Sequence, residues 1–109
     1  MEHVSRDADM KVIVRSETSI LKKIMEKKNE GFKLVALEQS DRSVSIFDYK
    51  FDRRTVLLVG NEKFGIVDHV LSQFEDIVEI PQYGQPFSLN VAISTGMALY
   101  EYCKQFPKG

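Results

Sequence analysis

The chain has 109 residues, a length that fits one domain rather than two. Apolar residues make up 43% and charged residues 28%, which is typical of a globular protein and excludes a disordered one. With 15 Lys and Arg against 16 Asp and Glu, the formal charge is −1, so nucleic acid would have to meet a local basic patch. No apolar run is long enough to span a membrane, and the N-terminal residues lack the apolar core of a signal peptide. We therefore expect a cytoplasmic protein with no membrane partner.

The numbers and spacing of cysteine and histidine residues limit which disulfides and metal sites the chain can form. Cys103 is the single cysteine, which excludes an intramolecular disulfide and a multi-cysteine zinc site. The two histidines have no Cys or His neighbours at ligand spacing, so we predict no metal site.

Short strand-like runs alternate with helix-like stretches along the chain. Residues 1–10 are expected to form a flexible N-terminal tail of a single domain over residues 1–109. Strands are expected over residues 11–15, 32–37, 55–59 and 77–80. Helices are expected from Ser16 or Thr18 to Asn29, from Ile66 to Gln73, and from Ser88 to about Gln105.

Two of these elements carry further information. Gly31 suits the end of the first helix, and residues 55–59 are apolar throughout, as in a central strand covered on both faces. Residues 43–51 are ambiguous and fit a loop with one turn of helix. Because strands and helices alternate, the sequence predicts an α/β fold with a mainly parallel sheet.

The last helix carries more apolar surface than one stripe requires. Ile93, Met97 and Tyr100 follow one row, and a neighbouring set consists of Ala92, Leu99, Tyr102, Cys103 and Phe106. A helix that is apolar on two sides needs two partners. One is its own sheet, and we expect the other to be a second subunit.

Two loops that follow apolar strands are candidate sites, because α/β sheets bind ligands beyond the carboxyl ends of their strands. In the first, Gly60 and Gly65 allow the backbone to approach a ligand closely, and Glu62 between them offers a carboxylate. The alternative interpretation is an ordinary strand-to-helix turn with a solvated Glu.

The second loop spans residues 80–90 and combines two prolines with one glycine. Ser88 or Asn90 can cap the following helix, whose free N–H groups would attract an anion or an electron-rich group. The alternative here is capping without any ligand.

Together the two loops resemble motifs two and three of the SpoU (TrmH-like) branch of the SPOUT methyltransferases. The resemblance rests on VGNEKFG at residues 59–65 and VEIPQYGQPFSLNVA at residues 78–92, each in a strand-loop-helix context. VALEQ at residues 35–39 and the C-terminal helix also agree with the family.

This resemblance implies a SPOUT-like α/β-knot fold, in which the C-terminal segment threads a preceding loop to form a trefoil knot. It implies a homodimer packed through the last helix, S-adenosylmethionine as the cofactor, and methylation of a ribose 2′-hydroxyl in tRNA or rRNA. By motif, the catalytic residues would be Glu62, Ser88 and Asn90. The cofactor-binding residues would be Val59, Gly60, Asn61, Gly65, Ile80, Pro81, Ser88, Leu89 and Asn90.

Motif one of the family, an Asn followed by a catalytic Arg, has no counterpart in these residues. The sequence therefore fits the C-terminal two-thirds of the domain, truncated at the N-terminus. This leaves a second hypothesis, a non-catalytic module of the same fold that binds cofactor or a partner. A third is an unrelated α/β nucleotide or anion binder that uses the helix start at Ser88.

Overall fold

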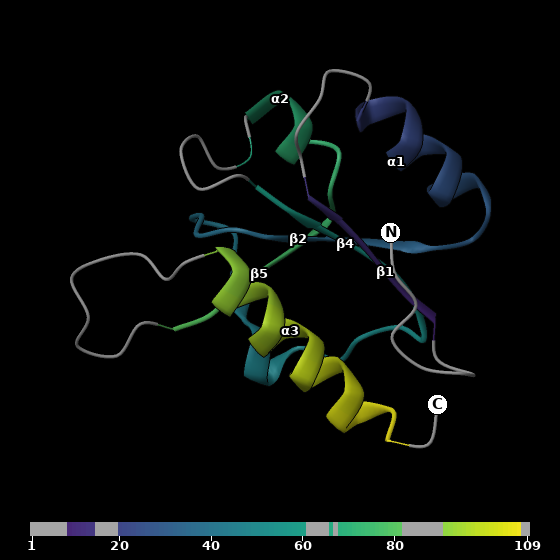
Figure 1. The fold of residues 1–109 in the computed structure, drawn as a ribbon. Coiled ribbons are helices and arrows are strands. Elements are labelled where there is room, and N and C mark those ends of the chain that lie inside the picture. Colours follow the sequence, from purple (N-terminus) through teal and green to yellow (C-terminus); the bar gives the residue numbers. More distant parts are fainter. Residues whose placement is uncertain (1–8, 15–19, 61–65, 67, 82–90, 108–109) are drawn as a thin grey trace.

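In the computed structural model, a parallel sheet carries helices on both faces (Figure 1). The structure describes residues 9–14, 20–60, 66, 68–81 and 91–107. Its strands are β1 (Asp9–Val14), β2 (Lys33–Leu37), β3 (Val44–Ser45), β4 (Arg54–Val59) and β5 (Asp76–Glu79). Its helices are α1 (Ile20–Asn29), the 3-10 helix η1 (Ile46–Asp48), α2 (Asp68–Leu71) and α3 (Val91–Gln105). This order of elements confirms the expected α/β class.

The strands lie in the order β1-β4-β2-β5-β3, and every neighbouring pair runs parallel. In the centre, Leu57 of β4 pairs with Val12 of β1 on one side and with Val35 of β2 on the other. Residues 55–59 are all buried, which confirms that this apolar run is a central strand. Because all strands run the same way, their carboxyl ends meet at one edge of the sheet.

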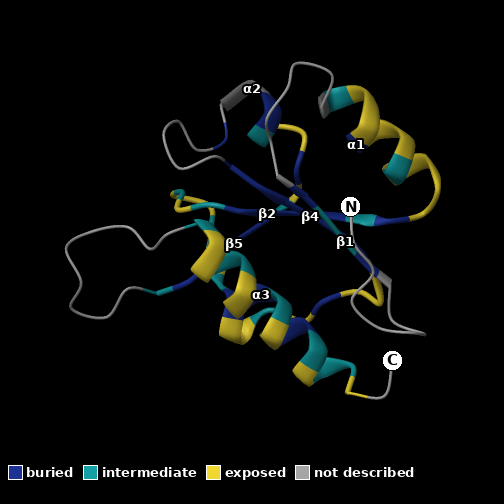
Figure 2. Ribbon diagram, viewed as in Figure 1, coloured by how far each residue is buried: buried dark blue, intermediate teal, exposed yellow. Residues whose placement is uncertain are grey.

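Each face of the sheet has its own apolar core. Successive strand side chains point to opposite faces. Leu57 and Val59 therefore pack toward α3 together with Tyr102, whereas Val56 and Leu58 pack in the second core beside α1 and α2. The central parts of β2, β4 and β5 are dark blue in Figure 2, and the helices expose their outer sides. Within the described ranges, no helix is long and apolar enough to cross a membrane.

The end of α1 shows how the chain turns into β2. The Phe32 N–H donates to the Lys27 carbonyl (3.1 Å) and the Gly31 N–H to the Lys28 carbonyl (3.0 Å), the pattern of a Schellman motif. Gly31 has φ +94°, a conformation that residues with a Cβ rarely adopt. Phe32 then enters the core, so the stop expected at Gly31 is confirmed.

Three boundaries differ from the sequence expectation. β1 begins at Asp9, and Met10 is fully buried, so these two residues belong to the sheet rather than to the expected tail. Residues 44–45 form an additional strand, β3, which pairs with β5 at the edge of the sheet before the single turn of η1. α2 is only four residues long, and Phe74, three residues after its end, is buried in the core.

The expected trefoil knot depends on the loops that join β4 to α2 and β5 to α3. Residues 61–65 and 82–90 lie outside the described part of the chain, as does the expected helix start at Ser88. The knot therefore stays a prediction.

Candidate functional site

The candidate site lies at the carboxyl edge of the sheet, where the two motif strands end. β4 ends at Val59 and β5 at Glu79, on either side of β2. Leu37 of β2 pairs with Val59 on one side and with Val78 on the other. Neighbouring strands lie about 4.8 Å apart, so the two motif strands end about 10 Å from each other. This edge is where parallel α/β sheets bind their ligands.

The described members of the predicted cofactor-binding set gather at this edge. Val59 and Ile80 are buried, Gly60 is buried, and Pro81 is half-buried. Val59 and Ile80 belong to the same apolar core, and Val91, the first residue of α3, packs against it. The structure thus brings together the end of the first motif strand, the end of the second, and the start of the last helix.

The remaining predicted site residues lie in the two loops outside the described residues. These are Asn61, Glu62, Gly65, Ser88, Leu89 and Asn90. Each loop leaves from a described strand end, and the second returns at Val91 of α3. The roles of these six residues remain predictions from the motif resemblance.

Glu38 is a polar residue at this edge for which the sequence indicated no role. It directly follows β2, and its N–H donates to the Val78 carbonyl (3.0 Å). Its carboxylate accepts the Ile66 N–H at Oε2 (2.8 Å) and the Gln39 N–H at Oε1 (3.2 Å). Ile66 directly follows the first motif loop, so Glu38 links that loop to the strand between the two motifs.

A second polar contact orders the turn beyond Glu38. The Ser43 hydroxyl donates to the Glu79 carboxylate and lies 2.7 Å from the Ser40 carbonyl, and the Arg42 N–H donates to the Ser40 hydroxyl (3.1 Å). Glu79 directly precedes Ile80. The turn at residues 40–43 is therefore joined to the second motif strand, and it places the exposed Arg42 at the carboxyl edge.

Arg53, which precedes β4, and Arg54, its first residue, lie at the opposite edge of the sheet. The Arg54 guanidinium donates to the Glu30 carbonyl (3.0 Å) and lies 4.3 Å from the centre of the Phe32 ring. At about 3.3 Å per strand residue, its backbone is about 17 Å from Val59. Neither Arg53 nor Arg54 is placed to act at the carboxyl edge.

A charged cluster also lies at the amino edge. The Tyr49 hydroxyl donates to Asp76 Oδ2 (2.5 Å), and Lys33 Nζ lies 3.5 Å from the same carboxylate oxygen. Burial and this hydrogen bond raise the pKa of Tyr49 far above its usual range. The cluster keeps Tyr49 neutral and fastens β2 and β5 together. Among the described residues, no group of three His, Cys, Asp or Glu side chains is placed to hold a metal ion.

α3 has one buried and one exposed side. Ala98 and Tyr102 are fully buried, and Glu101 is 4% exposed, with its carboxylate bonded to Gln105 and Lys104. On the other side are large apolar side chains, with 56% of Ile93, 36% of Met97 and 72% of Tyr100 exposed. The sequence expectation of two apolar sides is confirmed for this helix.

Comparison with known proteins agrees with the motifs. The model of the SpoU rRNA Methylase family matches residues 1–100. The tRNA (guanosine(18)-2'-O)-methyltransferase of Aquifex aeolicus is 34% identical over 104 residues, covering 95% of this chain and 49% of that relative. The enzyme of the same description from Mus musculus is 32% identical over 106 residues, covering 95% of this chain and 7% of that relative. The chain thus spans half or less of the length of these curated relatives.

Solved structures with a similar fold come from the same family. The A. aeolicus TrmH/SpoU tRNA modifying enzyme superposes with a TM-score of 0.72 at 38% identity, over 80% of this chain and 44% of that one. The SpoU methyltransferase AviRb from Streptomyces viridochromogenes was solved in complex with the cofactor AdoMet. It superposes with a TM-score of 0.70 at 27% identity, over 87% of this chain and 37% of that one. The chain has the parallel α/β fold of these methyltransferases. It belongs to the SpoU rRNA Methylase family.

Proposed function

We propose that this chain forms the cofactor-binding part of an S-adenosylmethionine-dependent RNA ribose 2′-O-methyltransferase. The observation that carries the proposal is the convergence of Val59, Ile80 and Val91 at the carboxyl edge of the sheet. Each of these residues borders one of the two motif loops. The names of the relatives, which are tRNA and rRNA 2′-O-methyltransferases, support the reaction.

The residues at this edge fit an adenosyl group. Val59 and Ile80 offer buried apolar surface at two strand ends, and Gly60 has no side chain to obstruct a ring lying against the backbone. We propose that these residues and Pro81 hold the cofactor, with Asn61, Gly65 and Leu89 contributing from the loops. When bound, the cofactor supplies an electrophilic methyl group on a sulfonium.

The task left to the protein is to position and activate the ribose hydroxyl. A hydroxyl is a poor nucleophile until its proton is removed or its alkoxide is stabilised. By motif, we assign this part of the site to Glu62, Ser88 and Asn90. Holding the hydroxyl in line with the methyl group accounts for much of the rate enhancement in reactions of this kind.

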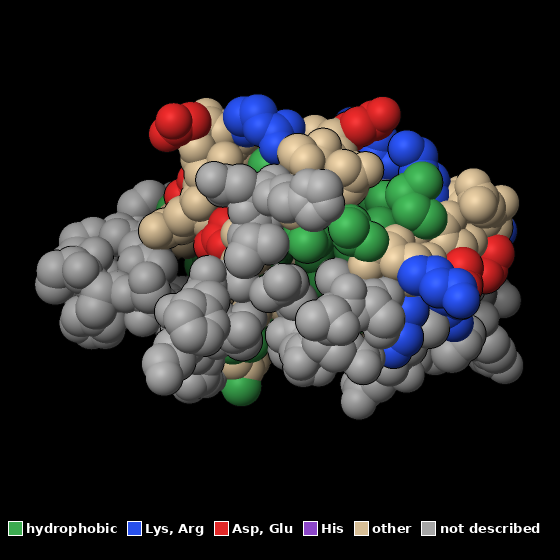
Figure 3. Space-filling view, turned by 90° about the horizontal axis from the view of Figure 1, so that it is seen from above, with side chains coloured by type: hydrophobic (Ala, Val, Ile, Leu, Met, Phe, Trp, Pro, Cys, Tyr) green, Lys and Arg blue, Asp and Glu red, His purple; other side chains and the backbone are tan. Residues whose placement is uncertain are grey.

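We propose tRNA or rRNA as the substrate, approaching the carboxyl edge. On the side of α1 and α2, Lys and Arg side chains lie among Asp and Glu side chains (Figure 3). Lys27, for example, pairs with Glu30 at 3.3 Å. That side is therefore a poor match for an RNA backbone, whereas Arg42 offers an exposed cation at the carboxyl edge.

Binding without methyl transfer is the second candidate function. It is favoured by the positions of Arg53 and Arg54, because neither lies near the carboxyl edge where the motif-one Arg of the family would act. In this case the chain would bind the cofactor with no turnover of its own.

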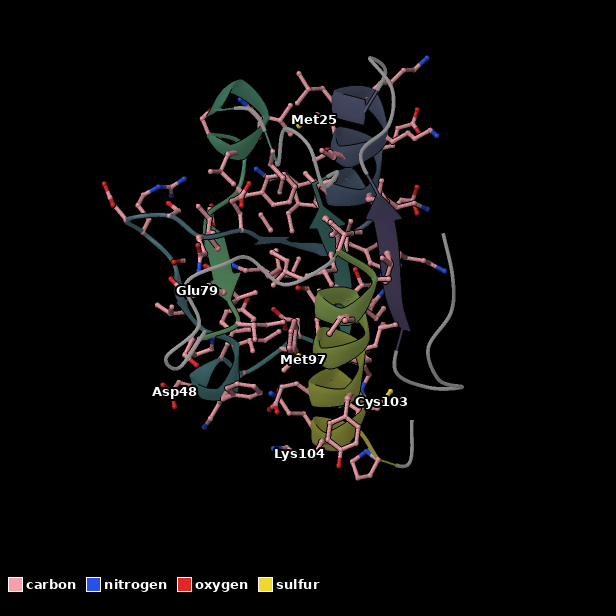
Figure 4. The ribbon with its side chains drawn as sticks, turned by 60° about the vertical axis from the view of Figure 1, so that its left-hand side comes forward. Met25, Asp48, Glu79, Met97, Cys103 and Lys104 are labelled. Carbon is pink, nitrogen blue, oxygen red and sulfur yellow. The ribbon has the colours of Figure 1, made fainter. Side chains whose placement is uncertain are left out.

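We also propose a homodimer packed through α3. Its exposed row of Ile93, Met97 and Tyr100 is a continuous apolar surface of the kind that subunit interfaces cover. Figure 4 shows Met97, Cys103 and Lys104 along this helix, on the far side of the sheet from Met25 on α1.

Calorimetric titration with S-adenosylhomocysteine, the product form of the cofactor, tests the proposal. We expect saturable binding of one molecule per chain. Transfer of a labelled methyl group to bulk tRNA or rRNA then separates the two candidates: transfer supports the methyltransferase, and binding without transfer supports the binding module. A folded chain that does not bind the cofactor product would contradict both.

A further inference from the structure

We infer that Glu38 is a positioning residue of the cofactor site, one that holds the far end of the Gly60–Gly65 loop through the Ile66 N–H. This inference rests on the proposed function, because the loop concerned is the one assigned to the cofactor. Glu38 lies outside both motif segments, and its role follows from its contacts rather than from the motif resemblance.

The position of Glu38 is set by the sheet. Its N–H bond to Val78 extends the pairing of β2 with β5 one residue beyond Leu37. Leu34 and Ala36 point toward the core beside α2, and by alternation the Glu38 side chain points to the same face. That face holds Ile66, so the carboxylate reaches the Ile66 N–H without leaving the direction that its strand imposes.

The bond fixes one end of the motif-two loop. Gly60, at the beginning of the loop, is buried at the end of β4. Ile66, which directly follows the loop, is 5% exposed, and its N–H is held by a carboxylate at 2.8 Å. Hydrogen bonds to ionised groups are stronger than bonds between neutral groups. Residues that are already held in place before a ligand binds have less conformational freedom to lose, which favours binding.

The same segment also contacts the second motif strand. Ser43, five residues after Glu38, donates to the carboxylate of Glu79, which precedes Ile80 and Pro81. The segment from Glu38 to Ser43 thus joins the two halves of the proposed site. Glu38 is the member of this segment that contacts Ile66, the residue after the motif-two loop, through its Oε2.

The test compares wild-type protein with Glu38→Ala and Glu38→Gln, measuring S-adenosylhomocysteine affinity by calorimetry and Ile66 amide exchange by NMR. For Glu38→Ala we expect affinity to fall about ten- to a hundredfold and Ile66 exchange to quicken, since one charge-assisted hydrogen bond is lost. Glu38→Gln keeps one acceptor oxygen, so it should restore part of both effects. Glu75→Ala is the matched control, because Glu75 is exposed at the amino edge and pairs with Lys33 at 3.4 Å.

The outcomes separate the two proposals. If the wild type binds and Glu38→Ala binds equally well, or if Ile66 exchange does not change, the role of Glu38 is wrong and the proposed function stands. If the folded wild type does not bind, the proposed function fails, and the role of Glu38 in it fails too. If Glu38→Ala is poorly folded, the decision falls to Glu38→Gln, where unchanged affinity and unchanged Ile66 exchange would overturn the inference.

Discussion

The hydroxyl of Tyr102 on α3 donates a hydrogen bond to the backbone carbonyl of Arg53, the residue before β4. Tyr102 is fully buried, and its ring meets Phe51 at 5.6 Å and Phe106 at 5.0 Å between centroids. Arg53 in turn places its guanidinium 5.0 Å from the centre of the Phe106 ring. The C-terminal helix is thus fastened to the start of the central strand, and it is the same helix whose first residue borders the proposed cofactor site.

Removing only this hydroxyl should destabilise the protein measurably. Tyr102→Phe leaves the Arg53 carbonyl without this partner, and we expect the free energy of unfolding to fall by about 1 kcal/mol. Tyr102→Ala also leaves a cavity, at a cost of about 3–5 kcal/mol. Urea denaturation measures both. An unchanged free energy of unfolding in Tyr102→Phe would contradict the assignment.

The cluster of Tyr49, Asp76 and Lys33 predicts how stability depends on pH. The pKa of Tyr49 is raised by burial first and then by its bond to Asp76. Burial lowers the pKa of Lys33, but the carboxylates of Asp76 and Glu75 outweigh it, so the net shift is upward. Both groups hold their protons more tightly in the folded chain than in the unfolded one. Their contribution is complete below pH about 10 and is lost as pH rises, because the unfolded chain releases these protons first.

We therefore expect the free energy of unfolding to decline above pH about 10, and to decline less steeply in Tyr49→Phe. The measurement is a series of urea titrations of both proteins from neutral to alkaline pH. At neutral pH the free energy of unfolding of Tyr49→Phe should also be lower by about 1.5–3 kcal/mol, the usual value for a hydrogen bond to a charged group. Curves that run parallel for the two proteins would show that Tyr49 does not titrate differently on folding.

Two methionines of similar exposure provide a matched test of the dimer. Met97 on α3 is 36% exposed and Met25 on α1 is 41% exposed, on opposite faces of the sheet (Figure 4). We expect Met97→Glu to produce a monomer at micromolar concentration, because the change buries a charge in the proposed interface. Met25→Glu should leave the mass unchanged. Analytical ultracentrifugation measures the mass of all three proteins in solution. A wild type that is already monomeric would exclude this interface.

The sequence predicted the long elements of the fold better than the short ones. Residues 55–59 could be identified as a central strand because an unbroken apolar run needs cover on both faces. β3 could not, since two residues at a sheet edge show no alternation, and only their pairing with β5 defines them. The burial of Met10 could not be predicted either, because a single apolar residue beside Asp9 does not establish the alternating pattern of a strand.

The site shows the same division. The positions of Val59, Gly60, Ile80 and Pro81 at the carboxyl edge could be predicted, because each stands where an apolar strand meets a loop. Glu38 could not, because its partner Ile66 is 28 residues away and the bond depends on which strands are neighbours. The available signals were a polar residue directly after a buried strand and the agreement of residues 35–39 with the family, and neither points to Ile66 as a partner.

The last prediction concerns the loop residues assigned by motif. If Glu62 and Asn90 act on the ribose hydroxyl, Glu62→Ala and Asn90→Ala should lower methyl transfer to RNA by about a hundredfold or more. The urea midpoint should change little, because an acting group at a loop contributes to the transition state rather than to the core.

Asn29→Ala and Glu26→Ala are the matched controls, since both residues are exposed on α1. Transfer of a labelled methyl group and urea unfolding, measured on all four variants, separate a chemical role from a structural one. If Glu62→Ala and Asn90→Ala keep full transfer and full cofactor affinity, the motif assignment is wrong. If they lose transfer only in proportion to lost stability, their role is to shape the loops, and the proton must be removed from the ribose by another group.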